Sequence, residues 1–280
     1  MADVSPLDVE YLVFTAHQNR YGVAHHAVVA IIDVPEHTEM PGMPPEVRGL
    51  IVHQGRSIPL FDLRVCFGEK TRLEETQELI QNMLQRKQDH INWLAQLKYE
   101  VLSNKPITVQ TNPELCAFGQ WYKNFRTDNL NLNAHMQHFD DPHRQIHRIA
   151  EEAATLLEKE RYEEAKHLIH LTERGSLLRL VELFDGVAEQ VKQYLLEYTI
   201  IFGVGETLFA MATDKINFFG PLHPIERLSP DETRQNRYDF INSIGHRKME
   251  GKSPEKPILL LDMERFVQKY PFLHSPPQPI

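Results

Sequence analysis

Among the histidines of the chain, His143 and His147 are four residues apart, a spacing that places both imidazole rings on one face of a helix. Two imidazoles placed in this way can bind one zinc ion together. The pair is a weak signal by itself, because a chain with 15 histidines contains about one such pair by chance. Further donors must accompany it before it predicts a metal site.

His90 and Cys116 have the chemistry to complete such a site. His90 falls on an apolar helix stripe, where an unpaired imidazole is costly to bury and a metal bond would satisfy it. The alternative is a core histidine bonded to a backbone carbonyl. Cys116 follows Asn112-Pro113, an N-cap signature, so we expect the helix dipole to favour its thiolate. The alternative for Cys116 is a small buried apolar residue.

The elements that must position these side chains are predicted to be helices. Only three of the 13 glycines and three of the 18 prolines lie between residues 70 and 200. Apolar residues recur with a period near 3.6 over 73–101, Asn112-Pro113 and Asp141-Pro142 each predict a helix start, and residues 161–194 predict a last long helix. Four or five amphipathic helices with short connections favour an antiparallel bundle. In such a bundle, three imidazoles and one thiolate would form a closed tetrahedral zinc set.

The flanks of this helical segment predict β-structure. Candidate strands cover residues 11–14, 23–34 and 49–52 before it, and residues 198–202, 207–213 and 258–261 after it. Neither flank has enough strands for a barrel, but together they have seven or eight. The pattern therefore predicts one sheet domain, interrupted by a helical insertion, and an α+β fold.

Composition narrows the class of protein. The formal charge of −9 disfavours nucleic acid and membrane surfaces as partners. With only two cysteines, the chain is not a secreted module held together by disulfides, and the count fits a reducing cytoplasm. Cys66 is expected to be a buried residue that packs in the core. The amino-terminal stretch is acidic and no apolar run approaches the roughly 20 residues that span a bilayer, so we expect a cytoplasmic protein.

Catalytic motifs are missing from the sequence. It has neither a Gly-x-Gly-x-x-Gly nor a Gly-Lys-Ser/Thr loop for phosphate, and no Gly-x-Ser-x-Gly nucleophile turn. The carboxylate pairs Asp140-Asp141 and Glu163-Glu164 fit a helix start and a solvated helix face. We therefore expect a protein that is not an enzyme.

The donor residues and their neighbours resemble a known family. The segments His90-Ile-Asn-Trp93, Cys116-Ala-Phe-Gly-Gln-Trp-Tyr122 and His143-Arg-Gln-Ile-His147 are similar to the signature of the chemoreceptor zinc-binding domain, over roughly residues 80–195. The resemblance implies that zinc level, or oxidation of the cysteine, is the signal. It implies zinc bound by His90, Cys116, His143 and His147, with four neighbours beside the ligands: Trp93, Phe118, Gly119 and Trp121.

The flanks resemble the two halves of a CheW-like domain. The first half is carried by Val47-Arg-Gly-Leu-Ile51 and Asp62-Leu-Arg64, and the second by Thr213-Asp-Lys-Ile216 and Ile258-Leu-Leu-Leu-Asp262. The family implies a pair of small SH3-type β-barrels that couple chemoreceptors to a histidine kinase. The expected organisation is a first half at 10–70, an inserted zinc-binding domain at 71–197, a second half at 198–268 and a disordered tail at 269–280.

Two positions depart from the CheW-like pattern. Gln54 stands where the family usually has arginine, and Ala30 stands where a glutamate is common. Both bear on the strength of partner contacts, for which the resemblance offers six candidate residues: Val28, Ile31, Arg48, Gly49, Gln54 and Gly55.

The sequence predicts a cytoplasmic chemotaxis adaptor whose coupling is modulated by zinc or by cysteine oxidation, and it leaves these two signals open. One alternative is an interaction scaffold held together by a structural zinc without sensing. Another is a zinc hydrolase, which needs a coordination position open to water. A homodimer through the bundle is compatible with the long amphipathic helices.

Overall fold

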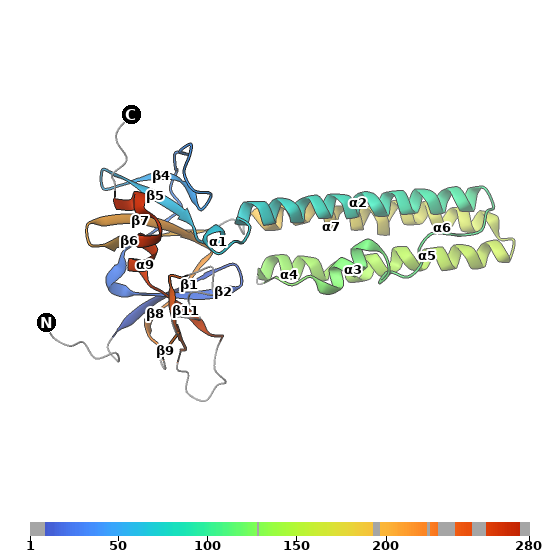
Figure 1. Ribbon diagram of the computed structural model, residues 1–280. Coiled ribbons are helices and arrows are strands. Elements are labelled where there is room, and N and C mark those ends of the chain that lie inside the picture. Colours follow the sequence, from blue (N-terminus) through green and yellow to red (C-terminus); the bar gives the residue numbers. More distant parts are fainter. Residues whose placement is uncertain are drawn as a thin grey trace. The chain divides into compact units, whose positions relative to one another are not determined.

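The chain divides into two compact units (Figure 1). The computed structural model describes residues 9–127, 129–192, 197–222, 225–228, 239–247 and 256–274. One unit comprises residues 1–72 together with 196–280 and contains the sheets, and the other comprises residues 73–195 and is helical. The predicted α+β class is confirmed.

Two sheets make up the first unit. One has six strands in the order β8-β1-β2-β11-β10-β9, and the other has five in the order β3-β6-β7-β5-β4. The strands are β1 (Glu10–Ala16), β2 (Asn19–Ala24), β3 (Val28–Asp33), β4 (Val47–His53), β5 (Arg56–Asp62), β6 (Tyr198–Val204), β7 (Thr207–Thr213), β8 (Lys215–Pro221), β9 (Ile225–Arg227), β10 (Ile241–Gly245) and β11 (Ile258–Leu261).

Each sheet combines strands from both sides of the helical insertion. β1 pairs with β8 and β3 with β6, both antiparallel, whereas β2 with β11 and β5 with β7 are parallel pairs. Neither flank can therefore complete a sheet without the other. The described residues contain eleven strands, so the estimate of seven or eight was too low.

The stretch 23–34, predicted as one strand, is two strands in different sheets. β2 ends at Ala24, a 3-10 turn (His25–Ala27) follows, and β3 begins at Val28. No glycine or proline lies between residues 23 and 34, so local composition does not mark the point at which the chain changes sheets.

A core of aromatic side chains joins the two sheets to two short helices, α1 (Leu63–Cys66) and α9 (Met263–Lys269). Cys66 is buried in this core, as the sequence predicted. The predicted disorder of 269–280 is wrong for its first part, because α9 runs to Lys269 and a 3-10 helix (Pro271–His274) places the ring of Phe272 6.1 Å from that of Phe61. Residues 275–280 lie outside the described residues.

The second unit contains six helices among its described residues, one more than the upper estimate. They are α2 (Arg72–Leu102), α3 (Ala117–Asn124), α4 (Leu130–Gln137), α5 (Asp140–Glu158), α6 (Tyr162–Arg174) and α7 (Ser176–Lys192). The long helix predicted over 161–194 is interrupted at Gly175, where α6 ends. Figure 1 shows these helices lying lengthwise in one elongated bundle, with α4 and α6 toward opposite ends.

Candidate metal centre

His90 lies on the buried face of α2, between the core residues Met83 and Leu94, and is 3% exposed. Its Nδ1 atom is 2.7 Å from the carbonyl oxygen of Arg86, one helical turn earlier. A ring nitrogen that donates to a carbonyl carries the hydrogen, so in the neutral ring Nε2 is the free acceptor. Nε2 is buried and has no hydrogen-bond partner within the described part of the chain.

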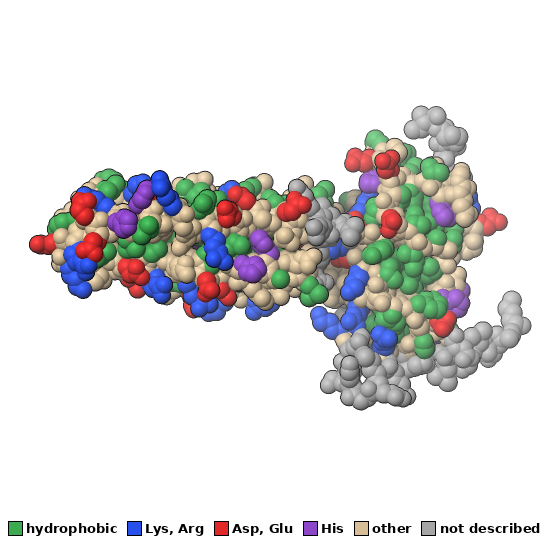
Figure 2. All heavy atoms as spheres, turned by 180° about the vertical axis from the view of Figure 1, so that it is seen from behind, with side chains coloured by type: hydrophobic (Ala, Val, Ile, Leu, Met, Phe, Trp, Pro, Cys, Tyr) green, Lys and Arg blue, Asp and Glu red, His purple; other side chains and the backbone are tan. Residues whose placement is uncertain are grey.

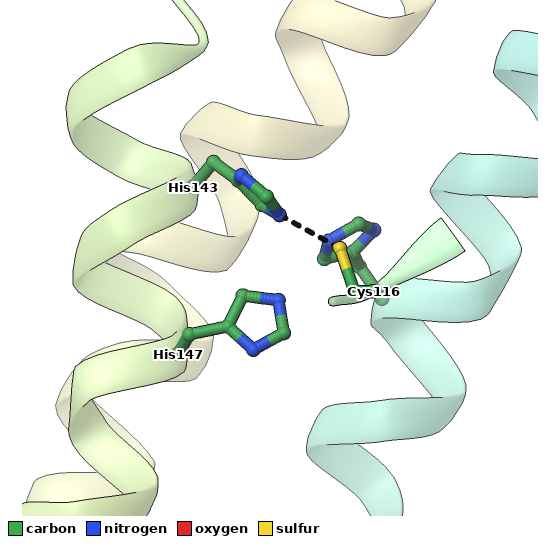
Figure 3. A group of neighbouring side chains, drawn as sticks. Cys116, His143 and His147 are labelled. Atoms are coloured by element: carbon green, nitrogen blue, oxygen red, sulfur yellow. Dashed lines mark hydrogen bonds between the residues drawn. The ribbon is translucent and has the colours of Figure 1, made fainter. Parts of the chain in front are cut away.

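The two histidines of α5 face the same point. His147 donates from Nδ1 to the carbonyl of Gln110 at 2.8 Å, and its buried Nε2 also has no hydrogen-bond partner among the described residues. Nε2 of His143 lies 3.2 Å from Sγ of Cys116 (Figure 3). Two buried imidazoles therefore present bare acceptor atoms, which is costly unless something binds them.

Cys116 is the N-cap of α3, and its Sγ accepts a hydrogen bond from the backbone N–H of Gly119 at 3.2 Å. The sequence predicted a helix start at Asn112. Instead, Asn112 accepts from the N–H of Glu114 in a turn, and the helix begins at Ala117. The turn packs closely on α3, because a Cβ at Gly119 would lie 1.9 Å from the carbonyl oxygen of Pro113.

The four predicted donors come together from α2, the start of α3, and α5. One ligand atom from each of His90, Cys116, His143 and His147 lies within 4.8 Å of the other three. Ligands about 2.0–2.3 Å from a tetrahedral zinc are about 3.3–3.8 Å apart, so shifts of about one ångström would close the set. Figure 3 shows the rings of His143 and His147 extending from α5 toward the sulfur of Cys116.

Burial keeps these histidines uncharged. It lowers the pKa of His90 to about 4 and that of His143 to about 3, and it also lowers the pKa of His147. Neutral imidazole is the form that binds metal. The cluster is therefore a set of neutral nitrogen donors held for a cation.

Cys116 does not show the lowered thiol pKa that the helix dipole was expected to cause. Burial raises the pKa of its thiol, and the hydrogen bonds from the N–H groups of Gly119 and Phe118 oppose this effect without outweighing it. A cation bound by Cys116 would supply the missing stabilisation of the thiolate, since a coordinating thiol is deprotonated.

Two of the residues predicted beside the donors, Phe118 and Trp93, lie against histidine rings of the cluster. The ring of Phe118 is 4.9 Å from that of His143, and the ring of Trp93 is 4.9 Å from that of His147. Trp121 lies farther away and packs on Phe118 at 6.0 Å. Gly119 allows the turn before α3 to pack closely, since a Cβ there would collide with the carbonyl oxygen of Pro113.

Gln110 was missed by the sequence interpretation. Its carbonyl oxygen accepts a hydrogen bond from Nδ1 of His147 and another from Nε1 of Trp93, each at 2.8 Å. A backbone carbonyl can come from any residue type, so no sequence signal could have found it. The loop that carries Gln110 also borders an open groove of about 570 Å³, lined by Thr111, Pro113, Asp141, Arg144, Gln145, Arg148 and Glu151.

The six candidate partner residues have different environments. Ile31 is 43% exposed on β3, and Gln54 and Gly55 are exposed in the turn between β4 and β5, with φ of 49° and 76°. These three are accessible to a partner. On the face shown in Figure 2, hydrophobic side chains gather over the sheet unit, whereas acidic and basic side chains alternate along the helical unit.

The other three candidates have structural roles that the sequence did not reveal. Arg48 is committed to ion pairs with Asp62 and Glu197, and Val28 packs on the core of the sheet unit. Gly49 lies against the backbone, where a Cβ would be 2.3 Å from the carbonyl oxygen of Thr38. These three residues have roles within the fold, and their expected contacts with a partner stay a prediction.

Comparison with known proteins yields two family matches. Residues 10–84 match the CheW-like domain, and residues 90–154 match the chemoreceptor zinc-binding domain. No curated protein matches the chain. A solved structure, the scaffolding protein TtCheW from Thermoanaerobacter tengcongensis, is similar at 11% identity and a TM-score of 0.39, covering 90% of this chain and 88% of that one.

Residues 10–84 therefore carry a CheW-like match and residues 90–154 a chemoreceptor zinc-binding match, and both resemblances found in the sequence are confirmed over these residues. Residues 198–268 lie outside both matches, so their assignment to the CheW-like domain stays a prediction. This combination, with a His/Cys/His/His cluster inside the second match, supports a chemotaxis adaptor that has a zinc-binding domain. Within the described residues, no helix is both long enough and apolar enough to cross a membrane.

Proposed function

We propose that the chain is a cytoplasmic adaptor that couples chemoreceptors to a histidine kinase, and that zinc bound by His90, Cys116, His143 and His147 modulates this coupling. The observation that carries the proposal is the cluster itself. In it, two buried Nε2 atoms that have no hydrogen-bond partner among the described residues face a third imidazole and a thiol. In this proposal the CheW-like domain comprises residues 10–70 and 198–268, and the zinc-binding domain comprises residues 71–197.

Zinc fits the donor set better than calcium or magnesium does. Calcium and magnesium prefer oxygen ligands, whereas imidazole and thiolate together suit zinc. The hydrogen bonds from Nδ1 of His90 and His147 to backbone carbonyls are the outer contacts that orient metal-binding histidines. Bound zinc would supply a positive charge that holds Cys116 as a thiolate.

A sensor of zinc or oxidant is favoured over a hydrolase. Four protein ligands fill a tetrahedron and leave no position for water. The cluster found among the described residues also contains no carboxylate to act as a general base. A cobalt-substituted sample tests this point, since an exchangeable bound water in its spectrum would favour the hydrolase.

Cys116 gives the cluster a route to redox sensing. A peroxide transfers one oxygen atom to the thiolate while its O–O bond breaks and hydroxide leaves, and the thiolate becomes a sulfenic acid. The donor set then falls from four strong ligands to three. Cys116 is half-buried beside a surface loop, whereas Cys66 is buried in the sheet core, so a small oxidant reaches Cys116 first.

The test is kinase phosphorylation in a mixture of chemoreceptor, histidine kinase and the full chain. The chain is added zinc-loaded, stripped by a chelator, or treated with dilute peroxide. We expect kinase activity to change at least about twofold between the zinc-loaded form and the other two. The Cys116→Ser variant should be insensitive to both treatments, and the Cys66→Ala variant should respond as the wild type does.

Equal kinase activity in all three states, with zinc binding intact, would favour the structural scaffold instead. Circular dichroism separates the two cases further. A purely structural zinc should leave the helical unit unfolded on chelation, whereas a sensor should stay largely helical.

A further inference from the structure

We infer that a buried network of three arginines and three carboxylates connects both ends of the helical insertion to helix α1, and that it transmits the state of the metal centre to the sheet unit. The inference rests on the proposed function, because it names the route of that regulation. The members of the network are Arg48, Asp62, Arg64, Arg72, Glu197 and Asp214.

The network begins where the chain re-enters the sheet unit. Glu197 is the residue before β6, and its two carboxylate oxygens lie 2.7 and 2.8 Å from Nη1 and Nη2 of Arg48. This paired geometry fixes both the distance and the orientation of the two groups. The side chains are 11% and 18% exposed, so water screens the pair weakly.

Arg48 connects Glu197 to Asp62. Its Nη2 lies 2.7 Å from Oδ2 of Asp62, whose side chain is 2% exposed. The other oxygen of Asp62 accepts from the backbone N–H groups of Arg64 and Val65, at 2.9 and 3.3 Å. A movement of Glu197 therefore acts, through one arginine, on the first turn of α1.

The other end of the insertion reaches the same helix. Arg72 is the first residue of α2, and its Nη1 lies 3.5 Å from Oδ1 and 3.3 Å from the carbonyl oxygen of Asp214. Asp214 also accepts from Nε and Nη2 of Arg64, at 2.8 and 2.7 Å. Arg64 belongs to α1, so the two ends of the insertion converge on one short helix.

The six groups carry three positive and three negative charges, and all are largely buried. Buried ion pairs often add little net stability, but removing one partner leaves an uncompensated charge that is strongly unfavourable. The network therefore tolerates few arrangements. A shift of α2 or α7 that moves Arg72 or Glu197 must be matched by a rearrangement around α1. Coupling between the metal centre and the sheet unit requires this kind of linked movement.

Hydrogen–deuterium exchange of the full chain tests the inference directly. The amides of Arg64 and Val65 report on the hydrogen bonds that Asp62 accepts. We expect their exchange rate to differ about threefold or more between zinc-loaded and chelated wild type. The variants Glu197→Gln and Arg72→Gln should bind zinc with unchanged affinity but lose this difference.

The matched control is Glu173→Gln, which removes a different ion pair, with Lys98, inside the helical unit. It should keep the zinc-dependent difference at α1. If the Glu197→Gln and Arg72→Gln variants also keep the zinc-dependent difference in exchange rate, the network is not the route. The same conclusion follows if wild type shows no such difference while kinase activity still responds to zinc. In both cases the proposed function stands. If wild type binds no zinc, the proposed function and this inference both fail.

Discussion

Trp93 and His147 donate hydrogen bonds to the same atom, the carbonyl oxygen of Gln110, and each bond is 2.8 Å long. The shared acceptor ties α2, the loop before Cys116, and α5 together at the edge of the donor cluster. It also fixes which nitrogen of His147 carries the hydrogen, and so keeps Nε2 bare for a metal.

Replacing Trp93 by phenylalanine should weaken zinc binding without removing any ligand. The substitution deletes the indole N–H but keeps a ring against His147, and we expect zinc affinity to fall about tenfold and stability by about 1 kcal/mol. Competition with a chromophoric chelator measures the affinity. Trp121→Phe is the control, because Trp121 packs behind Phe118, and an equal loss there would contradict the role given to Gln110.

The Cys116→Ser variant tests the thiolate ligand. Serine keeps the size of the side chain but is a poor zinc ligand at neutral pH, so we expect affinity to fall by about two orders of magnitude or more. Zinc titration with the same competitor gives the constant and the stoichiometry. Cys66→Ala should bind zinc as tightly as wild type, and unchanged affinity in Cys116→Ser would remove the cysteine from the site.

Gly119→Ala tests the close packing of the loop on α3. The new Cβ would lie 1.9 Å from the carbonyl oxygen of Pro113, so the turn that ends at Cys116 must shift. We expect a loss of about 1–3 kcal/mol in stability and a weaker zinc site, because the sulfur moves with the turn. Gly175→Ala, whose Cβ meets no atom closer than 3.1 Å, should leave zinc affinity unchanged.

The sequence predicted the donors because their chemistry is carried by side chains with a regular spacing. His143 and His147 share a face of α5 by virtue of their separation, and His90 follows the apolar stripe of α2. Cys116 was proposed from the N-cap signature that precedes it, and the family resemblance then added the neighbouring residues. Spacing within a helix is a local property, so it survives folding unchanged.

What the sequence could not predict depends on contacts distant along the chain or on the backbone. Asn112-Pro113 is a genuine N-cap signature, but a tight turn uses it, and the helix starts only after Cys116. Arg48 has the appearance of a free surface arginine until folding brings Glu197 to it, 149 residues later. The parallel pairing of β2 with β11 likewise has no local signal.

The metal-free helical unit should lose stability as the pH falls below 6.5. Burial lowers the pKa of His90 from 6.5 to about 4, so between these values the unfolded chain binds the proton and the folded chain does not. Stability is then fully present above pH 6.5 and decreases until about pH 4. His90 alone should lower the free energy of unfolding by about 2 kcal/mol between pH 7 and pH 5, and His143 and His147 should add to this loss.

Urea denaturation in the presence of a chelator measures the effect. Tryptophan fluorescence isolates the helical unit, since both tryptophans of the chain, Trp93 and Trp121, lie in it. The His90→Gln variant should show a shallower dependence on pH, whereas His170→Gln, which changes an exposed histidine of α6, should match wild type. If the metal-free wild type has the same free energy of unfolding at pH 7 and pH 5, the prediction that these histidines are buried and neutral in the folded chain is wrong.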